Sequence, residues 1–231
     1  MKQSYQEKTV IAVIIIISVF IIGGFIICPI IMYNKNTVRW LAIGDSITFG
    51  EDESHLSYAD YLSEAHSNIS LHKISWGGLG ISDLIRISGE GFTDDNDSID
   101  IVTVLIGAND FGFDTPIQEF ERDIDKYMNI LKDNFPNARI VFLTPLYRDY
   151  FGGTIPTMGG TINNLGISLY QYSDVITKQG VEHNIEVINL TNDDFLSDDN
   201  IRIYTLDGLH PNIAGNHMIA DKLYDKIGFS K

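Results

Sequence analysis

The sequence predicts an α/β fold in which a parallel sheet of five strands lies between two layers of helices. From Thr37 onward, short apolar runs alternate with longer segments that have the periodicity of amphipathic helices. The short runs are apolar at nearly every position, which is typical of parallel strands buried on both faces. Strands that alternate with helices in this way form one covered sheet, so the pattern predicts a single folded domain.

Most of the predicted strands are short apolar runs that end at a glycine, a proline or a polar segment, whereas the segment 70–75 contains more polar residues. The run at 101–106 is the clearest, because most of its residues are β-branched and it stops at Gly107. In the segment 116–134, apolar residues recur at helical spacing with charged residues between them. The predicted strands are 38–43, 70–75, 101–106, 139–144 and 185–190. The predicted helices are 56–67, 81–88, 116–134, 162–182 and 213–227.

Composition and charge exclude several classes of protein. The 231 residues include 16 Lys and Arg against 31 Asp and Glu, which gives a formal net charge of −15. A nucleic-acid partner is not expected, because phosphate binding needs a dense basic surface. The single Cys excludes a disulfide framework and a Cys-rich zinc site. The histidines other than His210 share no metal-ligand spacing, so we expect neither a metal nor a cofactor.

An apolar run without a charged residue covers residues 10–32. At about 1.5 Å per residue, a helix of that length crosses a hydrocarbon core of roughly 30 Å. We therefore expect an N-terminal tail at 1–9, an uncleaved transmembrane anchor at 10–32, a linker at 33–36 and the folded domain at 37–231. A cleaved signal peptide is the weaker alternative, since the flank has no small-residue cleavage site. A lipid-modified Cys28 is weaker still, because the residues before it are bulky.

Polar residues gather at the predicted carboxyl ends of the strands, where sites form in sheets of this kind. These segments are 44–48, 76–80, 107–110 and 207–211. Ser46 lies at a strand-to-helix turn, but a serine is a weak nucleophile unless a base takes its proton. Histidine is the usual base. His210 lies three residues after Asp207, so one tight turn can supply both a base and the carboxylate that orients it.

Acyl transfer to a serine also needs donors for the negative oxygen of the tetrahedral intermediate. Removing one such donor costs roughly 10²–10³ in rate. The backbone N–H of Ser46, the backbone N–H of Gly80 and the side-chain amide of Asn109 could supply three donors at this edge of the sheet.

The four polar segments, in this order, resemble the motif blocks of the SGNH (GDSL-type) hydrolase family. The matching residues are Gly44-Asp45-Ser46-Ile47-Thr48, Gly80, Gly107-Ala108-Asn109-Asp110 and Asp207-Gly208-Leu209-His210. Ile47 replaces the Leu that gives the family its name, and Ser75 stands where the second block often has Asn. The resemblance covers residues 39–228 and implies a flavodoxin-like three-layer α/β/α sandwich.

The resemblance also implies that the domain hydrolyses esters. By residue-to-residue correspondence, Ser46 is the nucleophile, His210 the base and Asp207 the carboxylate that orients it. The same correspondence makes Ser46, Gly80 and Asn109 the donors of the oxyanion hole.

The remaining residues of these blocks, and the long loop after the fourth strand, have simpler roles. Asp45 and Asp110 are expected to support their loops through hydrogen bonds to the backbone, and Thr48 is expected to be structural. The loop 146–160 is long for a compact domain, which is typical of a binding loop, although an exposed loop without a function is the alternative. The aromatic residues expected to line the substrate site are Trp76, Tyr147, Tyr150 and Phe151.

We therefore expect a membrane-anchored serine esterase that acts on a small-molecule or glycan ester, such as O-acetyl groups of cell-surface or extracellular glycans. The acidic domain is placed on the extracellular face, since few basic residues retain it inside and glycan substrates are outside; the flanking charges alone do not decide this. The alternative is a lipolytic esterase of the lysophospholipase or thioesterase type, which would expose an apolar patch beside Ser46. A third hypothesis is an inactive, anchored glycan-binding module, which would have no need of an intact Ser, His and Asp set.

Overall fold

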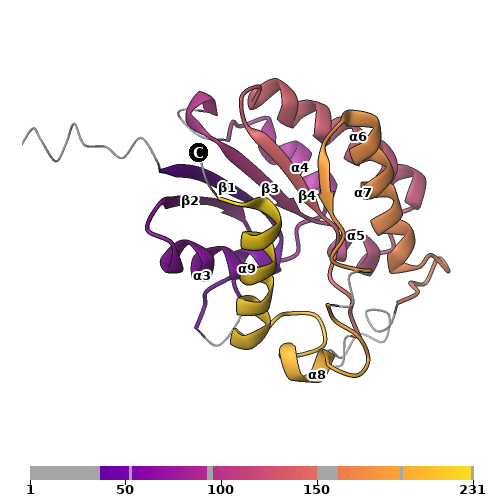
Figure 1. Cartoon of the computed structure of the whole chain (residues 1–231). Coiled ribbons are helices and arrows are strands. Elements are labelled where there is room, and N and C mark those ends of the chain that lie inside the picture. Colours follow the sequence, from indigo (N-terminus) through magenta and orange to yellow (C-terminus); the bar gives the residue numbers. More distant parts are fainter. Residues whose placement is uncertain (1–36, 52–53, 93–95, 150–160, 193–194, 230–231) are drawn as a thin grey trace, which may run out of the picture. The chain divides into compact units, whose positions relative to one another are not determined.

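A five-stranded parallel sheet forms the centre of the computed structural model (Figure 1). The strand order is β2-β1-β3-β4-β5, and every neighbouring pair is parallel. This is the order of flavodoxin-like folds, in which the chain reverses direction across the sheet beside β1. The strands are β1 (Val38–Gly44), β2 (Ile69–Ser75), β3 (Ile101–Leu105), β4 (Arg139–Leu143) and β5 (Glu186–Ile188). All five predicted strands are confirmed, and only the edge strand β5 is clearly shorter than the sequence predicts.

The structure describes residues 37–51, 54–92, 96–149, 161–192 and 195–229. Residues 38–231 form one compact unit, which corresponds to the predicted folded domain. The predicted tail, transmembrane anchor and linker lie outside the described residues. Within the described ranges, no helix is both long enough and apolar enough to cross a membrane.

Helices connect the strands and cover both faces of the sheet (Figure 1). The helices α3, α4, α6, α7 and α9 match predicted ones, whereas α2, α5 and α8 are short turns of helix at the ends of strands or in loops. The helices are α2 (Ser46–Phe49), α3 (Tyr58–Ala65), α4 (Ile81–Ser88), the 3₁₀ turn η1 (Asn96–Ser98), α5 (Ala108–Gly112), α6 (Ile117–Asn134), α7 (Leu169–His183), α8 (Ile201–Tyr204) and α9 (Ile213–Ile227).

Two hydrophobic cores lie on opposite faces of the sheet. Along β1, Trp40 and Ala42 point into the core under α3 and α9, while Leu41 and Ile43 point into the core under α4, α6 and α7. This alternation follows from the two-residue period of a strand. Because both faces of β1 and β3 are buried, these central strands are apolar at nearly every position, whereas the edge strand β2 contains Ser70, His72 and Lys73.

The pairing register brings the carboxyl ends of the central strands to one edge. Gly44 at the end of β1 pairs with Ser75 of β2 and with Leu105 of β3. Gly44 must be a glycine, because a Cβ there would come within 2.3 Å of the Thr48 hydroxyl oxygen and 2.6 Å of the Leu105 carbonyl oxygen. The chain can therefore turn sharply from β1 into α2 at this edge, where the polar segments meet.

The predicted helix at 162–182 is wrong at its start, because α7 begins only at Leu169. The preceding residues form a turn around Asn163, whose side-chain oxygen accepts hydrogen bonds from the backbone of Leu165 and Ile167. Ser168 then caps α7 through a reciprocal pair of hydrogen bonds with Gln171. A side chain that competes for backbone donors in this way delays the first turn of a helix.

Candidate active site

Ser46, His210 and Asp207 form a continuous hydrogen-bonded relay at the carboxyl edge of the sheet. Ser46 Oγ lies 3.0 Å from His210 Nε2, and His210 Nδ1 lies 2.7 Å from Asp207 Oδ2. Ser46 is the first residue of α2, directly after β1, whereas the other two precede α9 near the end of the chain. The fold thus brings together the three residues that the sequence predicts as nucleophile, base and orienting carboxylate.

The turn that carries Asp207 and His210 is fixed by its own hydrogen bonds. Asp207 Oδ1 accepts from the backbone N–H of Leu209 at 2.9 Å and of His210 at 2.8 Å, which leaves Oδ2 for the imidazole. The carboxylate accepts a hydrogen bond from the Nδ1–H group, so in the neutral ring Nε2 is the acceptor for the Ser46 hydroxyl. The geometry suits removal of the hydroxyl proton.

The pKa values of Asp207 and His210 are shifted in the directions that favour a charged Asp207 beside a protonated His210. Burial opposes the charge of Asp207, but the hydrogen bonds from His210 and Leu209 outweigh it and hold the pKa of Asp207 below its usual value. Burial also opposes the charge of His210, but the hydrogen bond and charge of Asp207 raise the pKa of His210 above its usual value. The imidazolium that forms when His210 takes a proton is therefore stabilised by Asp207.

Asp45 and Thr48 hold the helical turn that presents Ser46. Asp45 is the N-cap of α2, and its Oδ1 accepts from the backbone N–H of Ile47 at 3.0 Å. Burial raises the pKa of Asp45 to about 6, against the stabilising effect of that hydrogen bond. The Thr48 hydroxyl lies 3.0 Å from the hydroxyl of Tyr58 at the start of α3. Both residues have the structural roles expected of them.

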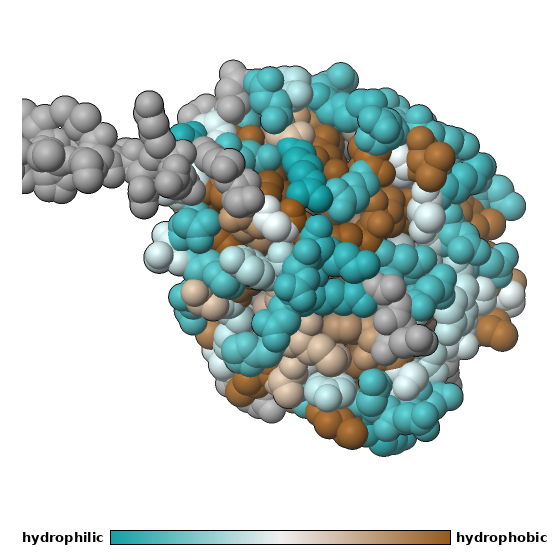
Figure 2. Space-filling model, viewed as in Figure 1, coloured by the Kyte–Doolittle hydropathy of each residue, from teal (hydrophilic) through white to brown (hydrophobic). Residues whose placement is uncertain are grey.

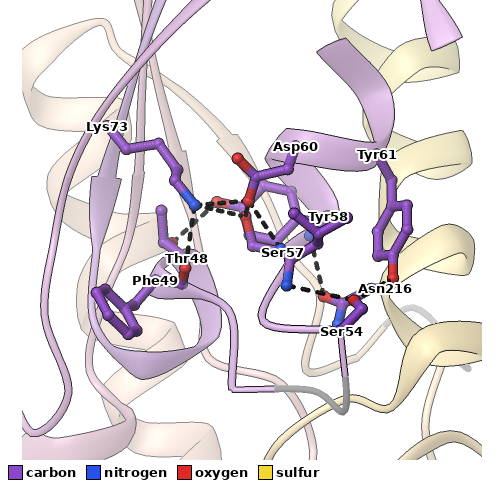
Figure 3. Close-up of polar contacts among 10 residues, drawn as sticks. Thr48, Phe49, Ser54, Ser57, Tyr58, Asp60, Tyr61, Lys73 and Asn216 are labelled. Carbon is purple, nitrogen blue, oxygen red and sulfur yellow. Dashed lines mark hydrogen bonds and ion pairs between the residues drawn. The ribbon is translucent and has the colours of Figure 1, made fainter. Parts of the chain in front are cut away.

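The segment that follows α2 is fixed by polar contacts with β2, α3 and α9 (Figure 3). Lys73 Nζ from β2 donates to the carbonyl oxygen of Phe49 at 3.0 Å and forms an ion pair with Asp60 Oδ2 at 2.5 Å. Asp60 Oδ2 also accepts from the backbone N–H of Ser57, so the carboxylate caps α3. Asn216 of α9 accepts from the backbone N–H of Tyr58 at 2.9 Å. These contacts tie both ends of the loop 50–57 to the rest of the domain.

The two other predicted oxyanion donors lie next to each other. Gly80 precedes α4, and Asn109 lies in the first turn of α5. The Asn109 amide donates to the Leu79 carbonyl oxygen at 3.0 Å and to Asp45 Oδ2 at 3.5 Å, while the Gly80 N–H donates to Asp83 Oδ2 at 3.2 Å. Both donors are thus engaged by protein acceptors, which a substrate oxygen would have to replace. Their role as oxyanion donors stays a prediction.

The buried carboxylate of Asp110 holds the turn at Gly80 and Ile81. Its side chain is 3% exposed, and both carboxylate oxygens accept from the backbone N–H of Ile81, at 3.1 and 3.2 Å. A Cβ on Gly80 would lie 3.0 Å from Asp110 Oδ1, so the carboxylate packs directly against the Gly80 turn. Burial raises the pKa of Asp110 to about 7, because the hydrogen bonds from Ile81 offset only part of the lost hydration.

Arg148 is a structural residue of the site that sequence reasoning missed. It is 1% exposed, and its Nη1 donates to the carbonyl oxygen of Ala108 at 3.0 Å, at the start of the helix that carries Asn109. The next residue, Asp149, donates its backbone N–H to the Gly208 carbonyl oxygen at 3.0 Å. The segment after β4 therefore links the α5 turn to the turn between Asp207 and His210. The sequence shows only that an arginine follows an apolar strand, and it does not reveal that this arginine contacts the Ala108 carbonyl oxygen.

Two of the four aromatic residues that were predicted to line the substrate site, Trp76 and Tyr147, lie among the described residues. Trp76 follows β2 directly and is 51% exposed at the edge of the sheet. Tyr147 donates its hydroxyl proton to Asp198 Oδ1 and, together with Tyr170, lines a separate pocket of about 390 Å³. Tyr150 and Phe151 lie outside the described residues.

A family model and several solved structures match this chain. A model of the GDSL-like lipase/acylhydrolase family matches residues 42–218, which is more than half of the chain. The chain belongs to this family. It is therefore an ester hydrolase, and the resemblance inferred from the four sequence blocks is confirmed. No curated protein sequence matches the chain.

Solved structures with the same fold come from several bacteria. A protein from Lactobacillus plantarum has a TM-score of 0.74 and 23% identity, covering 83% of this chain and 97% of that one. A lipase/acylhydrolase from Enterococcus faecalis has a TM-score of 0.66 and 20% identity, covering 84% and 98%. A catalytic mutant of an acetylxylan esterase from Geobacillus stearothermophilus has a TM-score of 0.62 and 19% identity, covering 83% and 94%. These likenesses establish the fold of the GDSL hydrolases.

Proposed function

We propose that this hydrolase is a serine esterase that cleaves short acyl esters through a covalent acyl-enzyme. The observation that carries the proposal is the relay from Ser46 Oγ through His210 to Asp207, with distances of 3.0 and 2.7 Å. His210 takes the Ser46 proton as Oγ attacks the ester carbonyl, and then delivers it to the leaving alcohol. Water, deprotonated by His210, releases the acyl group and restores Ser46.

We further propose that the oxyanion of each tetrahedral intermediate is held at the start of α2 and by the neighbouring donors. The N–H of Ser46 lies in the first turn of α2, where it has no acceptor within the helix. The Asn109 amide would turn from the Leu79 carbonyl toward the substrate oxygen, and the Gly80 N–H would turn from Asp83. Hydrogen bonds from these three donors would then stabilise the negative charge as it develops on the substrate oxygen.

The proposed substrates are O-acetyl groups of cell-surface or extracellular glycans. The acetylxylan esterase among the structural neighbours supports a short acyl group on a sugar, although it shares only the fold with this chain. The apolar run at 10–32 supports an anchor that keeps the domain at the membrane, with the domain on the extracellular face.

A lipolytic esterase is the second candidate, favoured by exposed aromatic residues at the edge that carries Ser46. Phe49 ends α2, Trp76 follows β2 and Phe113 follows α5, and they are 46%, 51% and 61% exposed. A lipid acyl chain could pack on such side chains. On the face shown in Figure 2, by contrast, hydrophilic residues predominate and hydrophobic ones form separate patches.

A series of p-nitrophenyl esters from acetate to palmitate separates the two candidates. The short-chain proposal predicts the highest kcat/KM for acetate and a steady decline with chain length. A maximum at eight carbons or more would support the lipolytic function instead. Absence of hydrolysis across the series, with the wild-type protein folded, would contradict both and support the binding module.

A further inference from the structure

A carboxylate outside the proposed relay lies beside the imidazole of His210. Glu51 Oε2 is 3.4 Å from His210 Nε2, the same ring nitrogen that contacts Ser46 Oγ. The Glu51 side chain is 41% exposed, whereas that of His210 is 18% exposed, so the carboxylate lies on the solvent side of the ring. A Cβ on Gly77 would come within 2.8 Å of Glu51 Oε1, which places the carboxylate between His210 and the segment after β2.

The local fold holds Glu51 in this position. Gly50 ends α2 in the left-handed conformation, with φ of 101°, and its N–H donates to the Ser46 carbonyl oxygen at 3.0 Å. A Cβ at Gly50 would lie 2.7 Å from the Leu56 carbonyl carbon, so only glycine fits this turn. Lys73 fixes the preceding Phe49 carbonyl (Figure 3). The chain therefore reverses directly after the helix that carries Ser46.

Three carboxylates act on His210, and each has a different relation to the ring. Asp207 accepts a hydrogen bond from Nδ1–H, Asp45 is buried at the N-terminus of α2, and Glu51 faces Nε2 from the loop after α2. An ionised carboxylate can only accept hydrogen bonds, so Glu51 interacts favourably with Nε2 when that nitrogen is protonated. Nε2 is the atom that delivers the proton to the leaving alcohol. The charge of Glu51 is therefore on the leaving-group side of Ser46.

We propose that Glu51 is a specificity-determining residue that makes the site favour esters of cationic alcohols and disfavour esters of anionic ones. The inference rests on the proposed function, since it requires ester cleavage at Ser46. The leaving alcohol must approach His210 Nε2, which is 3.4 Å from the carboxylate. At a separation of about 6 Å and an effective dielectric constant of about 40, one unit charge changes the rate roughly tenfold. A cationic and an anionic alcohol would then differ by up to roughly a hundredfold.

Glu51→Gln tests this proposal, because glutamine keeps the size of the side chain and removes its charge. The full chain, solubilised in a non-ionic detergent, is assayed by titration of the acetic acid released from three acetate esters. Acetylcholine is cationic, 3,3-dimethylbutyl acetate is its neutral isostere, and 2-sulfoethyl acetate is anionic. We compare the ratio of kcat/KM for the cationic ester to kcat/KM for the anionic ester. In Glu51→Gln this ratio should decrease by a factor of roughly ten to a hundred. The control Glu64→Gln removes an exposed carboxylate of α3 and should leave the ratio at its wild-type value.

The pH dependence gives a second readout that a merely structural effect would not move. Asp207 and Glu51 both raise the pKa of His210, so loss of the Glu51 charge should move the acid limb of kcat/KM for the neutral ester to lower pH. An unchanged ratio in Glu51→Gln, or an equal change in Glu64→Gln, would overturn the role of Glu51 while hydrolysis of the neutral ester still supports the proposed function. Failure of the wild-type chain to cleave any of the esters would overturn the proposed function and this inference with it.

Discussion

Replacing Asp110 by asparagine should weaken the pH dependence of folding stability. The carboxyl is 3% exposed, and burial raises its pKa from 3.8 to about 7. Between these two pH values the folded state binds a proton that the unfolded chain has released, so the free energy of unfolding falls as pH rises. Above pH 7 the folded protein carries a buried charge against the Gly80 turn. The asparagine side chain of Asp110→Asn would carry no charge at any pH and could still accept the hydrogen bond from Ile81.

The size of this effect follows from the displacement of the pKa. A shift from 3.8 to about 7 corresponds to roughly 4 kcal/mol over the whole range, at 1.36 kcal/mol per pKa unit. Most of this change in stability occurs above pH 5. The contribution of Asp110 to the free energy of unfolding should therefore decrease by roughly 2–3 kcal/mol between pH 5 and pH 8. The introduced amide brings two donors that the site must accommodate, so the pH dependence reports the charge better than the absolute stability does.

Urea unfolding of residues 38–231, followed by tryptophan fluorescence from pH 5 to pH 8, measures this difference. From pH 5 to pH 8, the free energy of unfolding should decrease by roughly 2–3 kcal/mol more for the wild-type protein than for Asp110→Asn. Asp133→Asn, which removes an exposed carboxylate of α6, is the control and should behave as the wild type does. Identical pH profiles for wild type and Asp110→Asn would refute the buried charge.

Three further outcomes are expected. Ser46→Ala and His210→Ala should each abolish ester hydrolysis, and the double variant should be scarcely slower than either, because the relay acts as a unit; Ser46→Ala retaining over a tenth of the wild-type rate would contradict this. Asn109→Ala should lower kcat by roughly 10²–10³ with little change in KM; a change in KM alone would make Asn109 a substrate-binding residue. The full chain should stay in the membrane fraction through a carbonate wash, since insertion of residues 10–32 is insensitive to charge screening; release of the protein would contradict the anchor.

The sheet was predictable because its strands obey a simple rule of burial. Parallel strands covered on both faces are apolar at nearly every position, and the run at 101–106 shows this most clearly. The turn before α7 was not predictable, because Leu165 and Ile162 lie four and seven residues before Leu169 and so continue the helical periodicity. Only the hydrogen bonds of Asn163 to the backbone reveal that this segment is no helix.

The same contrast holds for the site. Asp207 and His210 are three residues apart, so their partnership is visible in the sequence, and the strand-end position of Ser46 places it at the same edge. The positions of Glu51 and Arg148 depend on contacts with residues far away in the chain. Glu51 reaches His210 only because Gly50 reverses the backbone, and Arg148 reaches the Ala108 carbonyl only because α5 follows the neighbouring strand. No local pattern encodes either contact.

Covalent labelling of the chain tests the proposed nucleophile most directly. A fluorophosphonate reacts with a serine hydroxyl only where a base activates it, and the adduct is located by peptide mass spectrometry. We predict one adduct per chain, on Ser46, that is absent in Ser46→Ala and forms far more slowly in His210→Ala. An adduct on another serine, or labelling of Ser46 at the wild-type rate without His210, would contradict the relay on which the proposed function rests.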